Sequence, residues 1–258
     1  MKALVILIDE KNKEEKLIKS KDIICPKCKE SCKITMKEGK FKLYECINNH
    51  ITENIRIKDF LNTQKINMTE IICKNCSDKN MGNSYQNRFY RCLTCKTNLC
   101  LLCKDKHNKE NKDHTIILYE QKNYICPKHN GSFVEFCKKC LLNLCMICHE
   151  DHEDHDKIEF LKISPKKGEI NNKLLEIKNT IDIIKKDNIK YNNSNQLNNL
   201  IEILEIYNQI FSETLNNYDI RNTNYNTILN VKELINNNEL MQKLKEINQI
   251  KNLDNKIN

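Results

Sequence analysis

The chain has 258 residues, a formal net charge of +8, 30% charged residues, 6% aromatic residues and no tryptophan. These values disfavour one large apolar core and are compatible with several small modules. No dense Lys/Arg run accompanies the positive charge, so it gives little support for nucleic-acid binding. No apolar stretch approaches the roughly 20 residues that a membrane span needs, and we expect no membrane segment.

Cysteine is the unusual component of the sequence. All 15 cysteines lie between Cys25 and Cys148, and none lies in the last 110 positions. A disulfide framework would require export to an oxidising compartment. The apolar run at residues 3–8 is too short for a signal peptide and is followed at once by acidic residues. We therefore predict an intracellular, cytoplasmic protein (the nucleus stays open) whose paired cysteines bind metal.

Residues 1–66 form the first predicted segment. It contains a short strand over residues 3–8, a charged helix-like stretch and a loose Cys/His cluster. Within the cluster, a strand pair over residues 34–36 and 42–45 separates two halves of a single-zinc knuckle. Its predicted ligands are Cys25, Cys28, Cys46 and His50. Cys32 is left over, and the alternative is a loop with a few buried free cysteines.

The middle of the chain contains an internal repeat. Residues 92–107 match residues 137–152 with an offset of 45 at every candidate ligand and at both Asn-Leu pairs. This regularity predicts one supersecondary unit used twice, over residues 67–120 and 121–163. Each copy should begin with an extended stretch, over 89–91 and 134–136, before Cys92 and Cys137. A short helix should start near the following Cys pair, and a strand should follow the last His, over 115–118 and 158–161.

Each copy offers eight ligands, enough for two tetrahedral zinc ions. The first repeat offers Cys73, Cys76, Cys92, Cys95, Cys100, Cys103, His107 and His114, and the second offers Cys126, His129, Cys137, Cys140, Cys145, Cys148, His152 and His155. The spacing leaves two pairings open. Consecutive pairs could share an ion, or the first pair could join the third and the second pair the fourth.

The ligand order and gaps resemble the tandem B-boxes of tripartite-motif (TRIM) proteins, a type 1 box followed by a type 2 box. The Cys126-x2-His129 opening and the close His152-x2-His155 ending are typical of type 2. The resemblance implies the cross-braced pairing. Its sets would be Cys73, Cys76, Cys100, Cys103; Cys92, Cys95, His107, His114; Cys126, His129, Cys145, Cys148; and Cys137, Cys140, His152, His155. His149 could compete for the last set, but we expect a solvated helix residue.

Three rival classes of zinc protein fit less well. A RING needs eight ligands, but 22 residues separate His50 from Cys73, and using Cys73 would dismantle the first repeat. DNA-binding fingers with two Cys and two His have different gaps and no room for an extra Cys pair in the recognition helix. Catalytic zinc keeps an open position, whereas every predicted set closes with four ligands.

The segment 164–258 is predicted to be helical. Apolar residues follow heptad spacing from Ile170 through Ile184, a second seam restarts out of phase at Leu197, and a third runs over 240–257. The helices could fold on each other as a bundle. The TRIM resemblance implies instead a dimerising antiparallel coiled coil. The predicted fold class is thus small zinc-stabilised α+β modules followed by an all-α helical or coiled-coil region.

The sequence favours a non-enzymatic, zinc-binding protein-interaction scaffold of the TRIM type, with five structural zinc ions and protein partners. Fourteen zinc-bound thiolates and five divalent ions would lower the net charge to about +4. The alternative is a TRIM-like E3 ubiquitin ligase that acts through a degenerate N-terminal zinc module and recruits a ubiquitin-conjugating enzyme. A homodimer through the helical segment is also expected.

Overall fold

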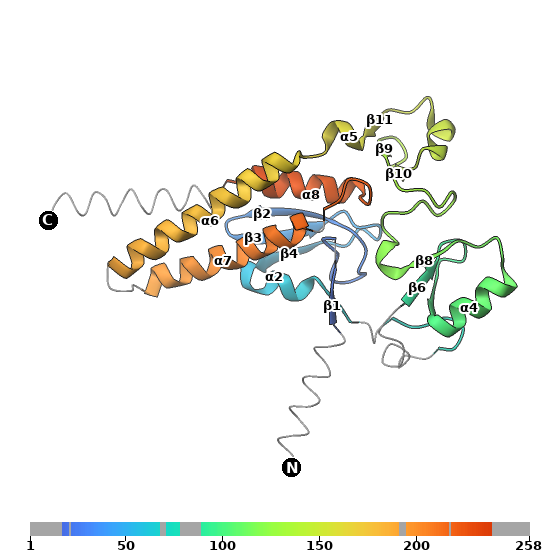
Figure 1. Ribbon diagram of the computed structural model, residues 1–258, viewed down its shortest axis with the longest axis horizontal. Helices are drawn as coiled ribbons and strands as arrows, with labels where there is room; N and C mark the ends of the chain where they lie inside the picture. Colours follow the sequence, from blue (N-terminus) through green and yellow to red (C-terminus); the bar gives the residue numbers. More distant parts are fainter. Residues whose placement is uncertain are drawn as a thin grey trace, which may run out of the picture. The chain divides into compact units, whose positions relative to one another are not determined.

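The computed structural model describes residues 17–20, 22–67, 71–77, 89–190, 195–216 and 218–238 (Figure 1). The chain forms two compact units. Unit 1 comprises Met1–Lys21, Gln64–Ile163 and Asp219–Tyr225, and unit 2 comprises Asp22–Thr63, Ser164–Tyr218 and Asn226–Asn258. Each unit is therefore assembled from separate segments, whereas the sequence suggested consecutive domains. The predicted strand at 3–8 and the helical seam at 240–257 lie outside the described residues.

Unit 1 contains two copies of one small sheet. In the first repeat, β6 (Phe89–Cys92) is the central strand between β7 (Thr97–Cys100) and β8 (Ile116–Leu118). In the second, β9 (Glu135–Cys137) lies between β10 (Leu142–Leu144) and β11 (Lys157–Glu159). All pairings are antiparallel. Arg91 pairs with Asn98 and Phe136 with Asn143, so the register also repeats with an offset of 45.

The remaining elements of unit 1 are short. A two-stranded sheet pairs β1 (Leu17–Lys19) with β5 (Lys65–Asn67). The helix expected near the third Cys pair is α4 (Leu101–Glu110) in the first repeat and the 3-10 helix η3 (Ile147–His152) in the second. A 3-10 turn, η2 (Tyr119–Gln121), follows β8. The strand expected over 158–161 ends at Glu159, because Phe160 begins the short helix α5 (Phe160–Ile163).

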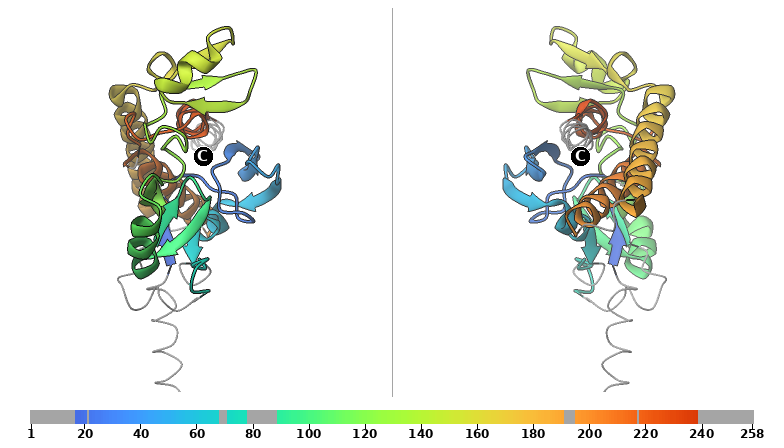
Figure 2. Two further views of the ribbon diagram at one scale, coloured as in Figure 1. Left: turned by 90° about the vertical axis from the view of Figure 1, so that its right-hand side faces the viewer. Right: turned by 90° about the vertical axis from the view of Figure 1, so that its left-hand side faces the viewer.

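Unit 2 combines a sheet with helices. Strands β2 (Lys33–Lys37), β3 (Lys40–Tyr44) and β4 (Thr52–Arg56) form an antiparallel sheet in that order. Helix α2 (Ile57–Thr63) follows β4. The long helices α6 (Lys167–Lys190) and α7 (Asn195–Asn216) lie side by side (Figures 1 and 2), and α8 (Tyr225–Asn236) completes the set.

One apolar core joins the sheet and helices of unit 2. Alternate residues of β2 and β3 are buried, as expected for a sheet with one covered face. Phe41 of β3 packs on Phe60 of α2 with ring centroids 4.5 Å apart. The same cluster includes Ile177 and Ile184 of α6 and Phe211 of α7. The first heptad seam is therefore buried within its own unit, as in the bundle alternative, and self-association stays a prediction.

Helix α8 covers the edge strand β2 with polar side chains. The side-chain Oδ1 of Asn230 accepts a hydrogen bond from the Ile34 backbone N–H at 2.9 Å, and its Nδ2 donates to the Cys32 carbonyl at 2.8 Å. Thr35 donates to Glu233 at 2.9 Å. Asn230 thus pairs with the strand edge as a neighbouring strand's peptide group would, which protects that edge. Among the described residues, every helix is too short or too polar to cross a lipid bilayer.

Candidate metal centres

Five groups of four Cys and His side chains come together in the described part of the chain. Within each group, the possible ligand atoms all lie within 4.8 Å of one another. The groups have the same membership as the sets predicted from sequence: Cys25, Cys28, Cys46, His50; Cys73, Cys76, Cys100, Cys103; Cys92, Cys95, His107, His114; Cys126, His129, Cys145, Cys148; and Cys137, Cys140, His152, His155. In both repeats, the first and third ligand pairs along the chain form one group, and the second and fourth pairs form the other.

The distances between sulfur atoms fit a shared metal ion. A tetrahedral zinc with Zn–S bonds of about 2.3 Å places two sulfurs about 3.8 Å apart. The Sγ atoms of Cys28 and Cys46 are 3.7 Å apart, and those of Cys126 and Cys148 are 3.6 Å apart. A disulfide would need about 2.05 Å. All 15 cysteines lie among the described residues, and none of them forms a disulfide.

The histidine nitrogens are at similar separations. A tetrahedral zinc places sulfur and nitrogen about 3.5 Å apart, and two nitrogens about 3.3 Å apart. His155 Nδ1 is 3.4 Å from Cys137 Sγ and 3.3 Å from His152 Nδ1. His107 Nε2 is 3.2 Å from His114 Nδ1. The donor sets are thus sulfur and imidazole nitrogen at the spacing of zinc ligands, and the residues present fit that metal.

Five of the seven Cys-x2-Cys or Cys-x2-His pairs lie in tight turns, and the other two, Cys100/Cys103 and Cys145/Cys148, lie at the starts of α4 and η3. The residue directly after the second ligand has a positive φ in all five turns, at 58°, 52°, 56°, 54° and 56°. A non-glycine residue in this left-handed region costs about 1–2 kcal/mol. The turn at Cys73, for example, is closed by a hydrogen bond from the Ser77 N–H to the Cys73 carbonyl at 2.9 Å. The left-handed residues are Lys29, Ser77, Lys96, Asn130 and Leu141.

Backbone amides also point at the sulfur atoms. The N–H of Cys95 donates to Cys92 Sγ at 3.3 Å, and the N–H of Cys140 donates to Cys137 Sγ at the same distance. In the N-terminal group, the His50 N–H donates to Cys46 Sγ at 3.2 Å. These hydrogen bonds favour the charged thiolate, which is the form that binds metal. They are the outer contacts that orient and tune a ligand.

The thiol pKa values of Cys145 and Cys148 show that thiolates in one group oppose one another. Burial opposes the Cys145 thiolate, but the Cys148 backbone and His129 stabilise it more and lower its pKa to about 7. Burial and then the neighbouring Cys126 and Cys145 raise the pKa of Cys148 to about 12. The first thiolate therefore forms near neutral pH and later ones are opposed by like charge, which a divalent cation would relieve.

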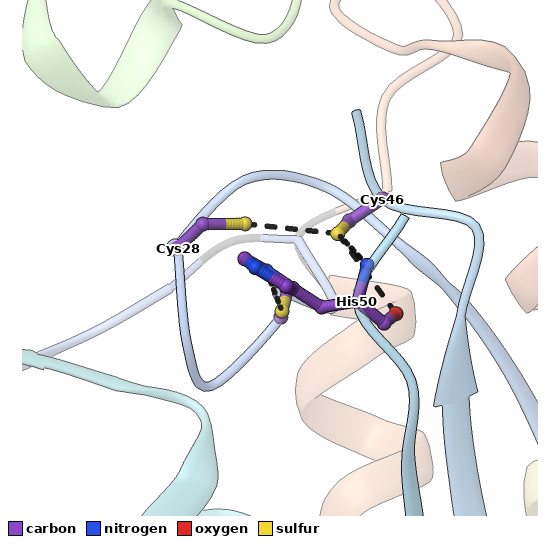
Figure 3. A group of neighbouring side chains, drawn as sticks. Cys28, Cys46 and His50 are labelled. Carbon is purple, nitrogen blue, oxygen red and sulfur yellow. Dashed lines mark hydrogen bonds between the residues drawn. The ribbon is translucent and has the colours of Figure 1, made fainter. Parts of the chain in front are cut away.

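The N-terminal group lies in unit 2. Figure 3 shows Cys28, Cys46 and His50 converging from two chain segments. Cys25 Sγ completes the group at 3.6 Å from His50 Nδ1. Cys32 lies outside it in the apolar core, with no exposed surface, and burial raises the pKa of its thiol. The structure thus places Cys32 as a buried core cysteine.

His149 also lies outside the metal groups. Its Nδ1 is 2.8 Å from Glu135 Oε2, and its Nε2 is 3.4 Å from Lys157 Nζ. Its side chain is half-exposed, whereas that of Glu135 is only 11% exposed. We expected a solvated helix residue, and the carboxylate partner was missed. No sequence signal indicated this pair, but an offset of 45 maps it onto Tyr90 and Lys104, which form a cation–π contact at 4.8 Å, so both repeats have a side-chain contact at these two positions.

Comparison of the chain with models of known protein families, with curated proteins and with solved structures finds no match. The function therefore has to be argued from the sites. Each group supplies four protein ligands, which is the composition of a structural zinc site, since catalytic sites keep one position open for water or substrate.

Proposed function

We propose that this chain is a non-enzymatic protein-interaction scaffold whose tandem B-box modules, of the TRIM type, are held together by structural zinc. The observation that carries the proposal is the interleaving of two four-ligand groups in each repeat. Interleaved sites tie the first and third ligand pairs together across the second pair. Losing either ion would therefore loosen the whole module.

The second repeat has few buried apolar side chains besides its ligand cysteines, namely Tyr124, Leu144 and Phe160. Its buried apolar cluster consists of Leu144 and four cysteines that belong to the metal groups: Cys126, Cys137, Cys145 and Cys148. A core made mainly of ligand sulfurs cannot offset the conformational entropy of ordering the module. Metal binding supplies folding free energy in small modules of this kind. The zinc then serves to present a surface, which is what a scaffold requires.

The test is affinity capture with the zinc-loaded full chain, followed by mass spectrometry of the retained proteins. The variant Cys137→Ser should lose those partners that bind the second repeat. The matched control is Cys32→Ala, which alters a buried cysteine outside every metal group and should retain the same partners. Equal capture by wild type and Cys137→Ser across all partners would contradict a zinc-dependent scaffold.

The ubiquitin-ligase alternative rests on the N-terminal module. A RING needs two interleaved sites, and the described residues from 22 to 67 contain one four-ligand group. We therefore assign the N-terminal group to holding unit 2 together, where Cys25 and Cys46 lie in the same core cluster as Ile177 and Leu204. Zinc-dependent autoubiquitination by the purified chain would overturn this assignment.

A further inference from the structure

The turn between β9 and β10 carries two exposed leucines. Leu141 is 73% exposed and Leu142 is 55% exposed. The equivalent turn of the first repeat carries Lys96 and Thr97, and Lys96 has the same φ of 56° as Leu141. The backbone of this turn therefore does not require leucine. Met146 and Ile147, five residues further on, are also more than half exposed, at 70% and 57%.

The chain beside this turn is acidic. Residues 150–156 contain five exposed carboxylates: Glu150, Asp151, Glu153, Asp154 and Asp156. The aligned positions of the first repeat, 105–111, carry Lys106 and Lys109 together with Asp105 and Glu110, and so have no net charge. The second repeat therefore differs from the first in two respects at once, because its turn is apolar and its flanking segment is acidic. Neither difference alters the metal ligands.

The exposed leucines and the acidic segment lie at the same end of the module, next to the group formed by Cys137, Cys140, His152 and His155. Cys140 Sγ, next to Leu141, is 3.3 Å from the Nδ1 of His155. The backbone N–H of Lys138 donates to the Asp156 carbonyl at 3.0 Å, and its Nζ pairs with the Asp156 carboxylate at 2.8 Å. Lys138 and Lys139 lie between residues 137 and 156, Lys157 follows this stretch, and Lys128 pairs with Asp151 at 3.9 Å, against the five carboxylates. Five carboxylates against four lysines leave a net charge of −1, with the acidic residues gathered in the segment 150–156.

The charge decides between three occupants of this surface. An anionic membrane surface would be repelled by the exposed carboxylates. A second copy that presented the same face would bring acid against acid. A basic amphipathic helix matches both features, because its apolar row can cover the leucines while Lys and Arg side chains face the carboxylates.

We propose that Leu141, Leu142 and the acidic segment 150–156 form a docking surface for a basic amphipathic helix of a partner protein. The inference rests on the proposed scaffold function and states which kind of partner one surface of the scaffold would bind. Burying two leucine side chains supplies the affinity, since each is worth several-fold in the dissociation constant. The carboxylates supply the selectivity for basic over acidic helices and the association rate.

The probe is a set of three fluorescein-labelled 18-residue peptides: an amphipathic Leu/Lys helix, the same helix with Glu in place of Lys, and a scrambled Leu/Lys sequence. Fluorescence anisotropy measures their binding to the zinc-loaded full chain. We expect the amphipathic basic helix to bind at least tenfold more tightly than either of the others. Equal affinity for the acidic helix or the scrambled sequence would overturn the proposal.

The first repeat supplies the variants. Leu141→Lys with Leu142→Thr, and separately Glu153→Asn with Asp154→Lys, place first-repeat residues at the aligned positions. Each double variant should keep five zinc ions and weaken binding of the basic helix at least fivefold. The control Leu102→Lys changes an exposed leucine of the first repeat and should leave the affinity unchanged. Unchanged affinity in the Leu141/Leu142 variant would contradict the proposal.

Two further measurements separate the other occupants. Sedimentation velocity would detect a dimer, and cosedimentation with phosphatidylcholine/phosphatidylserine vesicles would detect a membrane contact. Either association, if lost in the Leu141/Leu142 variant, would overturn the helix proposal in favour of that occupant. Failure of every peptide to bind, with partner capture still dependent on zinc, would refute this docking surface and leave the scaffold function standing.

Discussion

Replacing Cys100 by serine is expected to remove one zinc ion and unfold the first repeat. Cys100 lies at the end of β7 and begins the turn into α4, and its group joins it to Cys73, Cys76 and Cys103. Its Sγ is 4.0 Å from that of Cys76. A serine hydroxyl at this position is a poor zinc ligand, so the group is left with three thiolates and an open position.

The size of the effect follows from what the ion contributes. Structural zinc binds small modules with an apparent free energy of about 10–16 kcal/mol at neutral pH. That value is comparable to the whole net stability of an ordinary domain, about 5–15 kcal/mol. The other group of the repeat, with Cys92, Cys95, His107 and His114, uses the same β6–β7 hairpin and α4. We therefore expect cooperative loss of order throughout the first repeat.

Native mass spectrometry should show five ions for the wild type and no more than four for Cys100→Ser. Amide NMR signals of residues 89–118 should collapse to unfolded positions while those of the second repeat persist. The matched control Cys32→Ala should retain five ions, because Cys32 lies outside every group. Five tightly held ions in Cys100→Ser, with native spectra, would refute the ligand assignment and the reasoning from interleaved sites.

Three further outcomes are expected. Asn230→Ala should destabilise unit 2 by about 2–4 kcal/mol in urea unfolding, because the buried Ile34 N–H and Cys32 carbonyl each lose a partner; an unchanged midpoint would count against edge protection by α8. Zinc affinity of the first repeat should fall as the pH falls from 8 to 6 in chelator competition. In this repeat, burial opposes the Cys73 thiolate, but backbone hydrogen bonds from Cys100 and Cys76 outweigh burial and lower the pKa of Cys73 from 9.0 to about 7. The stability that this thiolate contributes is therefore present above pH 9 and is lost as the pH falls through about 7. Purified chain incubated with a panel of ubiquitin-conjugating enzymes should form no ubiquitin chains, and robust zinc-dependent chains would support a ligase.

Local sequence spacing was sufficient to predict the ligand residues and their pairs, but not which pairs share an ion. In five of the seven ligand pairs with two intervening residues, a left-handed residue directly follows the second ligand, as at Lys96 and Leu141. The strand register repeats with the same offset of 45, since Cys92 pairs with Thr97 and Cys137 pairs with Leu142. The choice of interleaved over consecutive pairing came from the TRIM resemblance, because spacing leaves both open.

The assembly of unit 2 could not be predicted from local pattern. Its sheet and its helices are distant in the chain, and the contact between Ile34 and Asn230 spans 196 residues. An asparagine in an Asn-rich segment gives no indication that its amide will pair with a strand edge. The heptad seam of α6 correctly indicated a buried face, but a heptad does not specify whether a helix or a sheet covers it.

The measurement that tests the central claim most directly is zinc X-ray absorption spectroscopy on chain whose metal content has been counted. The account predicts five ions per chain held by fourteen sulfur and six nitrogen ligands, with four protein ligands on every ion. The average first shell would then be sulfur-rich and free of water oxygen. An average shell with a water ligand, or with fewer than four protein donors per ion, would contradict structural zinc as the basis of this scaffold.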